Sequence, residues 1–299
     1  MLVVVAGGTG LLGSLVADRL VDQGHQVRAL SRGLSPHTGP HDPRVERVRG
    51  DVRDAAMLTT PLAGADVVVS AVQGFLGPDG VTPASVDRDG NRNLIDAAAR
   101  EGADVVLVSM TGASADSPME LARMKAAAEE HLRGAGVPWT VVRGAGFAQA
   151  WMDIVQGTAD ARGRLTVFGR ADNPIPWVDV REVAELVVRS VTDRALRGEI
   201  LELCGPESWT LGRLAAELMA ARGVAGRPRR IPRPALHVMA ATVGRLRPAM
   251  GRQARAALAM DVLPPADDSA TRARFPDLPR TPVSQVLAAR VAGRPTTVS

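Results

Sequence analysis

The stretch LVVVAGGTGLLGSLVADRL, residues 2–20, decides the fold of this chain. Its continuous apolar, β-branched start predicts a buried strand, and the amphipathic run from Leu11 predicts a helix that ends at Gly24. The turn between strand and helix holds four glycines: Gly7, Gly8, Gly10 and Gly13. Without side chains, the backbone N–H groups at a helix N-terminus can approach a pyrophosphate closely. The stretch therefore predicts a dinucleotide-binding turn, with a glycine-rich turn needed only for packing as the alternative.

Short β-branched runs continue to alternate with helical segments through the first half of the chain. Strands are expected at 26–30, 45–51, 65–72, 104–110 and 138–144, and helices near 54–62, at 85–102 and at 117–136. The last of these helices should have Ser117 as its N-cap and Pro118 at its first position. Apolar strands that alternate with helices predict an α/β fold, a Rossmann-like doubly wound parallel sheet.

The second half of the chain is less regular. It predicts extended segments at 164–169, 174–180 and 199–205, and helices at 181–193 and 210–223 that are capped by Asp179 and Thr210. This pattern indicates a smaller C-terminal α+β lobe. We assign residues 1–145, plus about 176–203, to the Rossmann domain, and about 146–175 and 204–299 to the substrate lobe.

Composition sets further limits on the class of protein. The single cysteine, Cys204, excludes an internal disulfide, and the scattered histidines do not predict a metal site, even where His37 and His41 lie close in sequence. The N-terminus lacks the basic segment of a signal peptide, and no apolar run reaches the roughly 18 to 20 residues of a membrane span. We expect a cytoplasmic protein without a membrane span.

The end of the second expected strand bears on the choice of cofactor. A site for NAD of this type usually has Asp or Glu there, which holds the ribose 2′-hydroxyl. This chain has Ser31 and Arg32 instead, and a guanidinium can bind a 2′-phosphate with two hydrogen bonds. The sequence therefore favours NADP(H) over NAD(H), with a solvated arginine in an arginine-rich chain as the alternative.

Seven segments together resemble the short-chain dehydrogenase/reductase superfamily, and in particular its atypical branch of NmrA-like and isoflavone-reductase-like NAD(P)H-binding proteins. They span about residues 1–210: GGTGLLG (7–13), GDVRD (50–54), VSA (69–71), VDRDGNRNLIDAA (86–98), VLVSM (106–110), KAAAEEHLRGAGVPWTVVRG (125–144) and WVDVREVAELV (177–187).

The resemblance implies a role for several residues of this chain. Asp51 and Val52 would contact the adenine, Ala71 and Val72 would line the ribose side, and the segment 144–147 would flank the nicotinamide. Ser109 would end the strand that leads into the active site, and Lys125 would reach the nicotinamide ribose, so Lys125 and Ser109 are the catalytic candidates. The full set of expected cofactor-binding residues is Gly7, Thr9, Gly10, Leu11, Leu12, Gly13, Ser31, Arg32, Asp51, Val52, Ala71, Val72, Lys125, Gly146 and Phe147.

The chain departs from the family where the catalytic motif Tyr-x-x-x-Lys is expected. The spacing places Leu121 and Lys125 there, and the chain has no tyrosine at all. Residues at i and i+4 share one face of a helix, so both side chains should point toward the cofactor. Lys125 is the only lysine, and an arginine cannot replace a compact ammonium with a tunable pKa. The alternative is an exposed Lys125 that pairs with Glu129 at i+4.

A basic stretch lies between Glu217 and Asp261, where residues 218–260 contain no acidic residue. It contains nine arginines: Arg222, Arg227, Arg229, Arg230, Arg233, Arg245, Arg247, Arg252 and Arg255. We consider a solvated face of the lobe, a site for an acidic substrate, acidic partner or acyl carrier protein within 222–255, and contact with an anionic membrane surface. Nucleic-acid binding is not predicted, because aromatic residues are not interleaved with the charges.

Two functions follow from these residues. The first is an NADPH-dependent reductase, or a related isomerase, that acts on a small carbonyl, enone or quinone without the usual tyrosine. The second is a non-catalytic NAD(P)H-binding redox sensor or scaffold of the NmrA-like type, which the missing tyrosine favours. A sugar-nucleotide epimerase is a minor alternative, since that chemistry relies on the absent tyrosine. The sequence does not indicate the oligomeric state.

Overall fold

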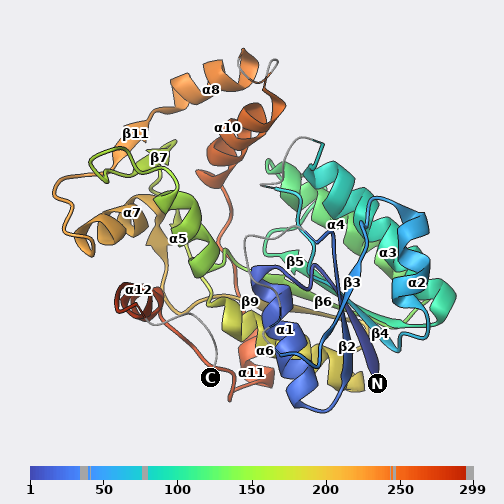
Figure 1. Cartoon of the computed structure of the whole chain (residues 1–299). Helices are drawn as coiled ribbons and strands as arrows, with labels where there is room; N and C mark the ends of the chain where they lie inside the picture. The colour runs from blue at the N-terminus through green and yellow to red at the C-terminus, as the bar shows by residue number, and fades with distance from the viewer. Residues whose placement is uncertain (34–39, 41, 76–79, 243, 245–246, 294–299) are drawn as a thin grey trace.

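A seven-stranded parallel sheet forms the centre of the molecule (Figure 1). The structure is a computed structural model that describes residues 1–33, 40, 42–75, 80–242, 244 and 247–293. His37, His41 and Arg245 lie outside the described residues. The strands stand in the order β3 (Glu46–Arg49), β2 (Gln26–Ser31), β1 (Leu2–Ala6), β4 (Val67–Ser70), β5 (Asp104–Met110), β6 (Trp139–Gly144) and β9 (Glu199–Leu203).

The strand order confirms the doubly wound parallel sheet predicted from the sequence. Every pair in the sheet is parallel, and β1 stands between β2 and β4, with Val5 opposite Ala29 on one side and Val69 on the other. The chain runs from β1 toward β3 and then crosses back to β4, so the order reverses beside β1. In such sheets ligands bind outside the carboxyl ends of the strands at this reversal.

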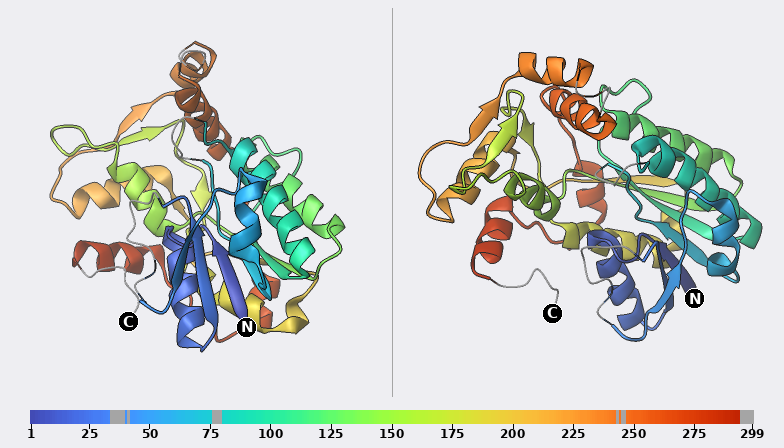
Figure 2. Two further views of the ribbon diagram at one scale, coloured as in Figure 1. Left: turned by 45° about the vertical axis from the view of Figure 1, so that its right-hand side comes forward. Right: turned by 45° about the horizontal axis from the view of Figure 1, so that its top comes forward.

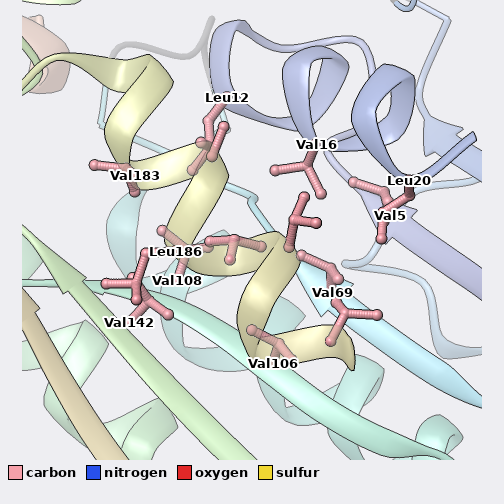
Figure 3. Close-up of a cluster of buried hydrophobic side chains, with 14 of the residues drawn as sticks. Val5, Leu12, Val16, Leu20, Val69, Val106, Val108, Val142, Val183 and Leu186 are labelled. Atoms are coloured by element: carbon pink, nitrogen blue, oxygen red, sulfur yellow. The ribbon is translucent and has the colours of Figure 1, made fainter. Parts of the chain in front are cut away.

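Helices α1 (Leu11–Asp22) and α6 (Val180–Thr192) cover one face of the sheet. Figure 3 shows valine and leucine side chains of both helices meeting the valines of the central strands: Val5, Leu12, Val16, Leu20, Val69, Val106, Val108, Val142, Val183 and Leu186. The cap of α6 is as predicted, because the Asp179 carboxylate accepts the N–H of Arg181.

The opposite face is covered by η1 (Ala55–Leu58), α2 (Thr59–Leu62), the π-helical turn η2 (Pro83–Arg88), α3 (Asp89–Glu101) and α4 (Glu120–Gly134). Alternate residues of the same strands point to this side, with Leu107 and Val105 of β5 packed on Leu94 and Leu132. Both faces of the sheet are therefore buried, which explains why its strands read as continuous apolar runs.

A smaller lobe of helices and short strands stands beside the carboxyl edge of the sheet (Figures 1 and 2). It contains α5 (Ala148–Gln156), β7 (Thr166–Phe168), β8 (Pro174–Ile175), β10 (Trp209–Thr210), α7 (Leu211–Ala220), β11 (Arg229–Ile231), α8 (Arg233–Ala241), α10 (Pro248–Met260) and α12 (Val283–Val291). The Thr210 hydroxyl caps α7 by accepting the N–H of Arg213, as predicted. None of the helices in the described part of the chain has the length and apolar character that a membrane crossing requires.

Three expected helix boundaries differ in the structure. Residues 54–62 form η1 and α2, and residues 85–102 form η2 and α3, in place of single helices. The expected N-cap Ser117 is wrong, since α4 begins at Glu120 with Met119 as its N-cap. The Ser117 hydroxyl instead accepts the Met119 N–H, and the Ser117 carbonyl accepts from Arg123, so this serine closes a turn before the helix.

The C-terminal region returns to the sheet through α11 (Ser269–Arg274), which contacts β9. The guanidinium of Arg272 is buried there, 3.0 Å from Glu182 on α6 and 2.9 Å from Asp268. It also donates to the Cys204 carbonyl at 2.9 Å. One buried cation thus joins the end of the chain to the helix layer beneath the sheet. The domain boundary drawn at residue 204 stays a prediction.

Replacing Arg272 with methionine should destabilise the protein by about 3–5 kcal/mol near neutral pH, because the carboxylate of Glu182 is left buried without its partner. Burial raises the pKa of Glu182, while the Arg272 charge lowers it. Without the arginine this pKa rises further, so protonation at lower pH should remove the unpaired charge. Urea unfolding at several pH values should show the deficit shrinking as pH falls from about 7 toward 5.

Arg274→Met is the matched control for this experiment. Arg274 belongs to the same short helix, but it is exposed and its nearest carboxylate, that of Glu199, lies 3.7 Å away. The expected loss is below about 1 kcal/mol. Equal losses in the two variants would contradict the role given to the buried ion pair.

Candidate functional site

The glycine-rich turn lies at the carboxyl end of β1, where the strand order reverses. Three of its glycines are required by packing. A Cβ at Gly7 would stand 2.7 Å from the Ala71 carbonyl oxygen, one at Gly8 would stand 2.7 Å from Cβ of Ala29, and one at Gly13 would stand 2.2 Å from the Gly7 carbonyl oxygen. These contacts hold α1 against β1 and hold β1 between its neighbours.

Gly10 differs from the other three glycines. It caps α1 with extended backbone angles, φ −81° and ψ 173°, which any residue adopts. A Cβ there would have one neighbour within 4 Å, the Gly7 carbonyl oxygen at 3.2 Å. The missing side chain of Gly10 therefore leaves space at the mouth of the turn, where a pyrophosphate approaches in folds of this type.

The first turn of α1 supplies donors beside this space. The first hydrogen bond within the helix runs from the Ser14 N–H to the Gly10 carbonyl at 3.0 Å, so the N–H groups of Leu11, Leu12 and Gly13 precede it. The Leu12 side chain is buried in the core, which leaves its backbone as the part that faces the turn. These N–H groups at the positive end of the helix dipole fit a dinucleotide pyrophosphate, and Thr9 lies within the same turn.

The end of β2 brings Ser31, Arg32 and Asp51 near one another. The Ser31 carbonyl accepts the Gly50 N–H at 2.9 Å, and its hydroxyl accepts the Gly33 N–H at 3.2 Å. Asp51 is 2.6 Å from the guanidinium of Arg53, and the pKa of Asp51 is lowered mainly by that hydrogen bond and less by the Arg32 charge. Arg53 is thus the ion-pair partner of the Asp51 carboxylate. Among the described residues Arg32 forms no ion pair.

Two further pairs of expected residues lie at the carboxyl edge of the sheet. Ala71 and Val72 follow β4, and Gly146 and Phe147 follow β6. A Cβ at Gly146 would come 2.8 Å from the Trp177 ring, and the Phe147 backbone bridges to Val178. Val52 is buried, and its carbonyl accepts from Asn93 at 3.0 Å.

Lys125 is buried on α4 and has three oxygen partners. Its ammonium donates to the carbonyls of Val72 and Val108, each at 3.0 Å, and stands 3.0 Å from a carboxylate oxygen of Asp87. The exposed pair with Glu129 that the sequence offered as an alternative is therefore wrong. The ammonium joins the loop after β4, the strand β5 and the helical turn η2 at the carboxyl edge of the sheet.

Asp87 is a residue of this candidate site that the sequence did not predict. Its second carboxylate oxygen accepts the Gly74 N–H at 2.8 Å, and burial raises the pKa of this carboxyl, with Lys125 opposing the shift. The sequence feature that could have pointed to Asp87 is its place on the expected helix at 85–102, within a segment that carries the family resemblance. Its link to Lys125, 38 residues away in sequence, requires the tertiary fold.

Ser109 belongs to a second buried polar cluster. Its hydroxyl donates to Glu129 at 2.6 Å, and the same carboxylate accepts from Arg143 at 2.6 and 2.9 Å and from Arg133 at 3.2 Å. Glu129 thus binds a strand residue on β5 and another on β6 to helix α4. The Ser109 proton already points to Glu129. To stabilise an oxyanion, the Ser109 hydroxyl would have to share this proton between the oxyanion and the Glu129 carboxylate.

A small pocket lies beside the face of α4 that carries Lys125. Leu121, one turn before Lys125, lines it together with Arg252 and Arg255 of the basic stretch. Leu121 is buried in the apolar core of the lobe, and Lys125 is buried as well. That both side chains point toward the cofactor stays a prediction.

Other chemistry receives no support from the described residues. No group of three or more His, Cys, Asp or Glu side chains among them could hold a metal ion. Burial, together with the Asp268 charge, raises the pKa of the Cys204 thiol to about 12, so this thiol is not a nucleophile at neutral pH.

Comparison with known proteins places this architecture in a family. Residues 7–194 match the model of a family described as NAD(P)H-binding. A (4-alkanoyl-5-oxo-2,5-dihydrofuran-3-yl)methyl phosphate reductase of Streptomyces griseus is 33% identical over 230 residues, which cover 77% of this chain and 76% of that protein. An NAD(P)H azoreductase of Xenophilus azovorans is 27% identical over 229 residues, 76% of this chain and 75% of that one.

The solved structures agree on the fold. The NADPH-dependent quinone oxidoreductase QOR2 of Escherichia coli, in complex with NADPH, superposes with a TM-score of 0.71 over 96% of this chain and 99% of that chain. The sequences of the two are 21% identical, so this likeness shows the fold alone.

Gly10→Ala should leave the fold nearly intact and weaken cofactor binding about tenfold or more. The new methyl group would stand 3.2 Å from the Gly7 carbonyl oxygen, a close contact that a small local shift relieves, and loss of a glycine N-cap costs about 1 kcal/mol. The same methyl group would occupy the approach of the pyrophosphate. Fluorescence titration with NADPH measures the affinity, and urea unfolding measures the stability.

Gly13→Ala is the contrasting variant. Its Cβ would collide with the Gly7 carbonyl, so the folded state itself should be lost or severely destabilised. If Gly10→Ala binds NADPH as tightly as the parent protein, the turn does not hold the pyrophosphate.

Proposed function

The chain belongs to the NAD(P)H-binding family, and on that premise we propose that it is an NADPH-dependent reductase of a small carbonyl, enone or quinone compound. One observation carries the proposal: the open turn at Gly10 and the buried ammonium of Lys125 lie at the same carboxyl edge of the sheet. The first would hold the dinucleotide, and the second provides a fixed positive charge where the reacting end would lie.

A bound nicotinamide cofactor would supply the hydride, which is the cofactor's own chemistry. The chain's residues would bind and orient it. The N–H groups of Leu11, Leu12 and Gly13 would hold the pyrophosphate, Asp51 and Val52 would lie at the adenine, and Ala71 and Val72 would line the ribose. Gly146 and Phe147 would flank the nicotinamide ring.

Lys125 has a positioning role before any contact with the cofactor. Its ammonium donates to the carbonyls of Val72 and Val108 and lies 3.0 Å from Asp87 Oδ1, which accepts no hydrogen bond within the described residues. Contact with a ribose hydroxyl is simplest if one of the two carbonyls is exchanged for it. We propose that the Val72 carbonyl is exchanged, since it lies on a loop and not within a strand. The ammonium would then hold the ribose and stabilise negative charge that develops on the substrate oxygen.

A hydroxyl group is the second element of the proposed site. Ser109 keeps its place as an oxyanion candidate, although its proton is directed to Glu129. Thr111 follows two residues later, is half-buried, and its hydroxyl has no hydrogen-bond partner within the described residues. Comparison of Ser109→Ala with Thr111→Val by steady-state kinetics separates the two hydroxyls.

The named relatives support reduction of an unsaturated carbonyl compound. The Streptomyces griseus protein is named as the reductase of an oxo-dihydrofuran that carries alkanoyl and methyl phosphate groups, and the Xenophilus azovorans protein as an azoreductase. Both names are those of reductases, and the first describes an unsaturated carbonyl compound. Neither relative's substrate is thereby assigned to this chain.

A non-catalytic NAD(P)H-binding sensor or scaffold is the second candidate function. It is favoured by Leu121, which has no proton to donate where the family resemblance implies tyrosine, and by the two carbonyls and the carboxylate that already surround the Lys125 ammonium. Such a protein would bind NADPH without oxidising it in the presence of any carbonyl compound.

Lys125→Met should reduce NADPH oxidation with quinones and enones by at least about a hundredfold. The single variant also leaves Asp87 buried without its cation, which should cost about 3–5 kcal/mol of stability. The double variant Lys125→Met/Asp87→Asn removes the unpaired charge and should regain most of that stability without regaining activity. Optical assay of NADPH oxidation and urea unfolding measure the two effects.

Activity that returns with stability in the double variant would show that Lys125 acts only through the fold. Tight NADPH binding by the parent protein without turnover on any carbonyl, enone or quinone would favour the sensor or scaffold instead.

Arg32→Ala should weaken NADP(H) binding about tenfold or more and change NAD(H) binding little, because the guanidinium has no ion-pair partner among the described residues and is available to a 2′-phosphate. Arg53→Ala is the comparison, since Arg53 is already paired with Asp51. Calorimetric titration with both cofactors decides the matter, and an equal loss for both would refute the preference for NADP(H).

A further inference from the structure

A pocket of about 50 Å³ lies where the lobe meets the sheet domain. One wall comes from the first turn of α4, with Leu121 and Arg123, and from Phe75 after β4. The other wall is α10, with Arg252 and Arg255. In Figure 1, α10 is the part of the lobe that lies toward α4, and residues of both helices line the pocket. Figure 2 shows the lobe from two further sides.

The lining of this pocket carries an excess of positive charge. Three guanidiniums, those of Arg123, Arg252 and Arg255, face one carboxylate, that of Glu120. Within the described residues none of the three arginines forms an ion pair, and Arg123 donates only to the Ser117 carbonyl. The Nε of Arg252 is buried and has no hydrogen-bond partner at all in the described part of the chain.

Arg252, which is half-buried with a buried Nε, contrasts with two other arginines that are largely or partly removed from solvent. Arg272 has two carboxylates and three carbonyls as partners, and Arg143 has the carboxylates of Glu129 and Glu202. A buried N–H without a partner costs about 1–3 kcal/mol, and more when the group is charged. An anion in the pocket would satisfy this N–H and balance the cluster.

We propose that Arg252 and Arg255, together with Arg123, bind a phosphate monoester on the substrate that this protein reduces. The proposal rests on the proposed reductase function and adds the substrate class. A phosphate monoester carries nearly two negative charges at neutral pH and three acceptor oxygens, which suits several guanidiniums at once. The pocket volume of about 50 Å³ exceeds the roughly 10–15 Å³ that a single water molecule requires, so a larger group has room there.

The position of the pocket relates the anion to the reacting group. Leu121 lines the pocket and shares one helix face with Lys125, one turn farther along α4. A substrate whose phosphate rests against α10 would extend along the apolar surface of Leu121 toward the ammonium of Lys125. The phosphate would then fix the carbonyl end of the molecule at the carboxyl edge of the sheet.

Direct binding of inorganic phosphate tests the anion site apart from catalysis. The protein is first saturated with NADPH, so that the dinucleotide site is filled, and phosphate is added in a calorimeter at constant ionic strength. Binding is expected for the parent protein and for Arg229→Gln, which alters an exposed arginine of the same basic stretch on β11, outside this pocket. Binding should be lost in Arg252→Gln/Arg255→Gln.

Paired substrates test the consequence for reduction. A cyclic enone with a hydroxymethyl group is compared with its phosphate monoester by NADPH oxidation. The ester should have a KM lower by about ten- to a hundredfold. The double arginine variant should lose this preference, with KM for the alcohol and the affinity for NADPH unchanged, and Arg229→Gln should keep it.

The outcomes separate the two proposals. If phosphate binds and depends on Arg252 and Arg255 but neither enone is reduced, the reductase function fails and the anion site stands. If the alcohol is reduced as well as the ester, or if the double variant loses both equally, the phosphate site is overturned. A lower KM for an enone on an acyl carrier protein than for the free ester, with a loss in Arg229→Gln, would overturn it in favour of a protein partner.

Discussion

The close approach of α1 to the end of β1 is the constraint on which the site depends. The Gly13 backbone lies so near the Gly7 carbonyl that a single methyl group would not fit between them. This contact seats α1 on the sheet beside α6 and holds its N-terminus at the reversal of strand order (Figure 3). In the same turn a Cβ at Gly10 would have one neighbour within 4 Å, the Gly7 carbonyl oxygen at 3.2 Å, so one local arrangement serves both the packing of α1 and the approach of a dinucleotide.

Buried charge organises the rest of the carboxyl edge. Lys125 with Asp87, Glu129 with Arg143, and Arg272 with Glu182 each join elements far apart in sequence. In a low dielectric these pairs persist only with well-formed hydrogen bonds, and removal of one partner costs more than the pair itself contributes. The loop after β4, helix α4 and the C-terminal region are therefore tied to the sheet by groups whose charge the proposed chemistry can also use.

Arginine serves two purposes in this chain. Inside the sheet domain each buried guanidinium has a carboxylate partner, whereas in the pocket beneath α10 the arginines face one another and a single glutamate. The lobe thus adds Arg252 and Arg255 to one side of the pocket, next to a sheet domain whose buried charges already have partners. The stretch at 218–260 contains no acidic residue, and the sequence allowed either a solvated basic face or an anion site there. The pocket arginines without carboxylate partners favour the anion site.

The sequence alone determined the order of strands and helices, the glycine turn, the caps Asp179 and Thr210, and the shared face of Leu121 and Lys125, because these depend on residues near one another in the chain. Only the tertiary structure decided that Lys125 pairs with Asp87 and not with Glu129, and that Arg252 and Arg255 line one pocket with Leu121. Ser117 lost its expected role as a cap to a turn held by Arg123. For Lys125 and for the arginines of α10 the neighbours come from elements distant in sequence, a placement that no local pattern encodes. The Ser117 turn is local, but its bond to Arg123 competes with the capping geometry that the sequence predicted.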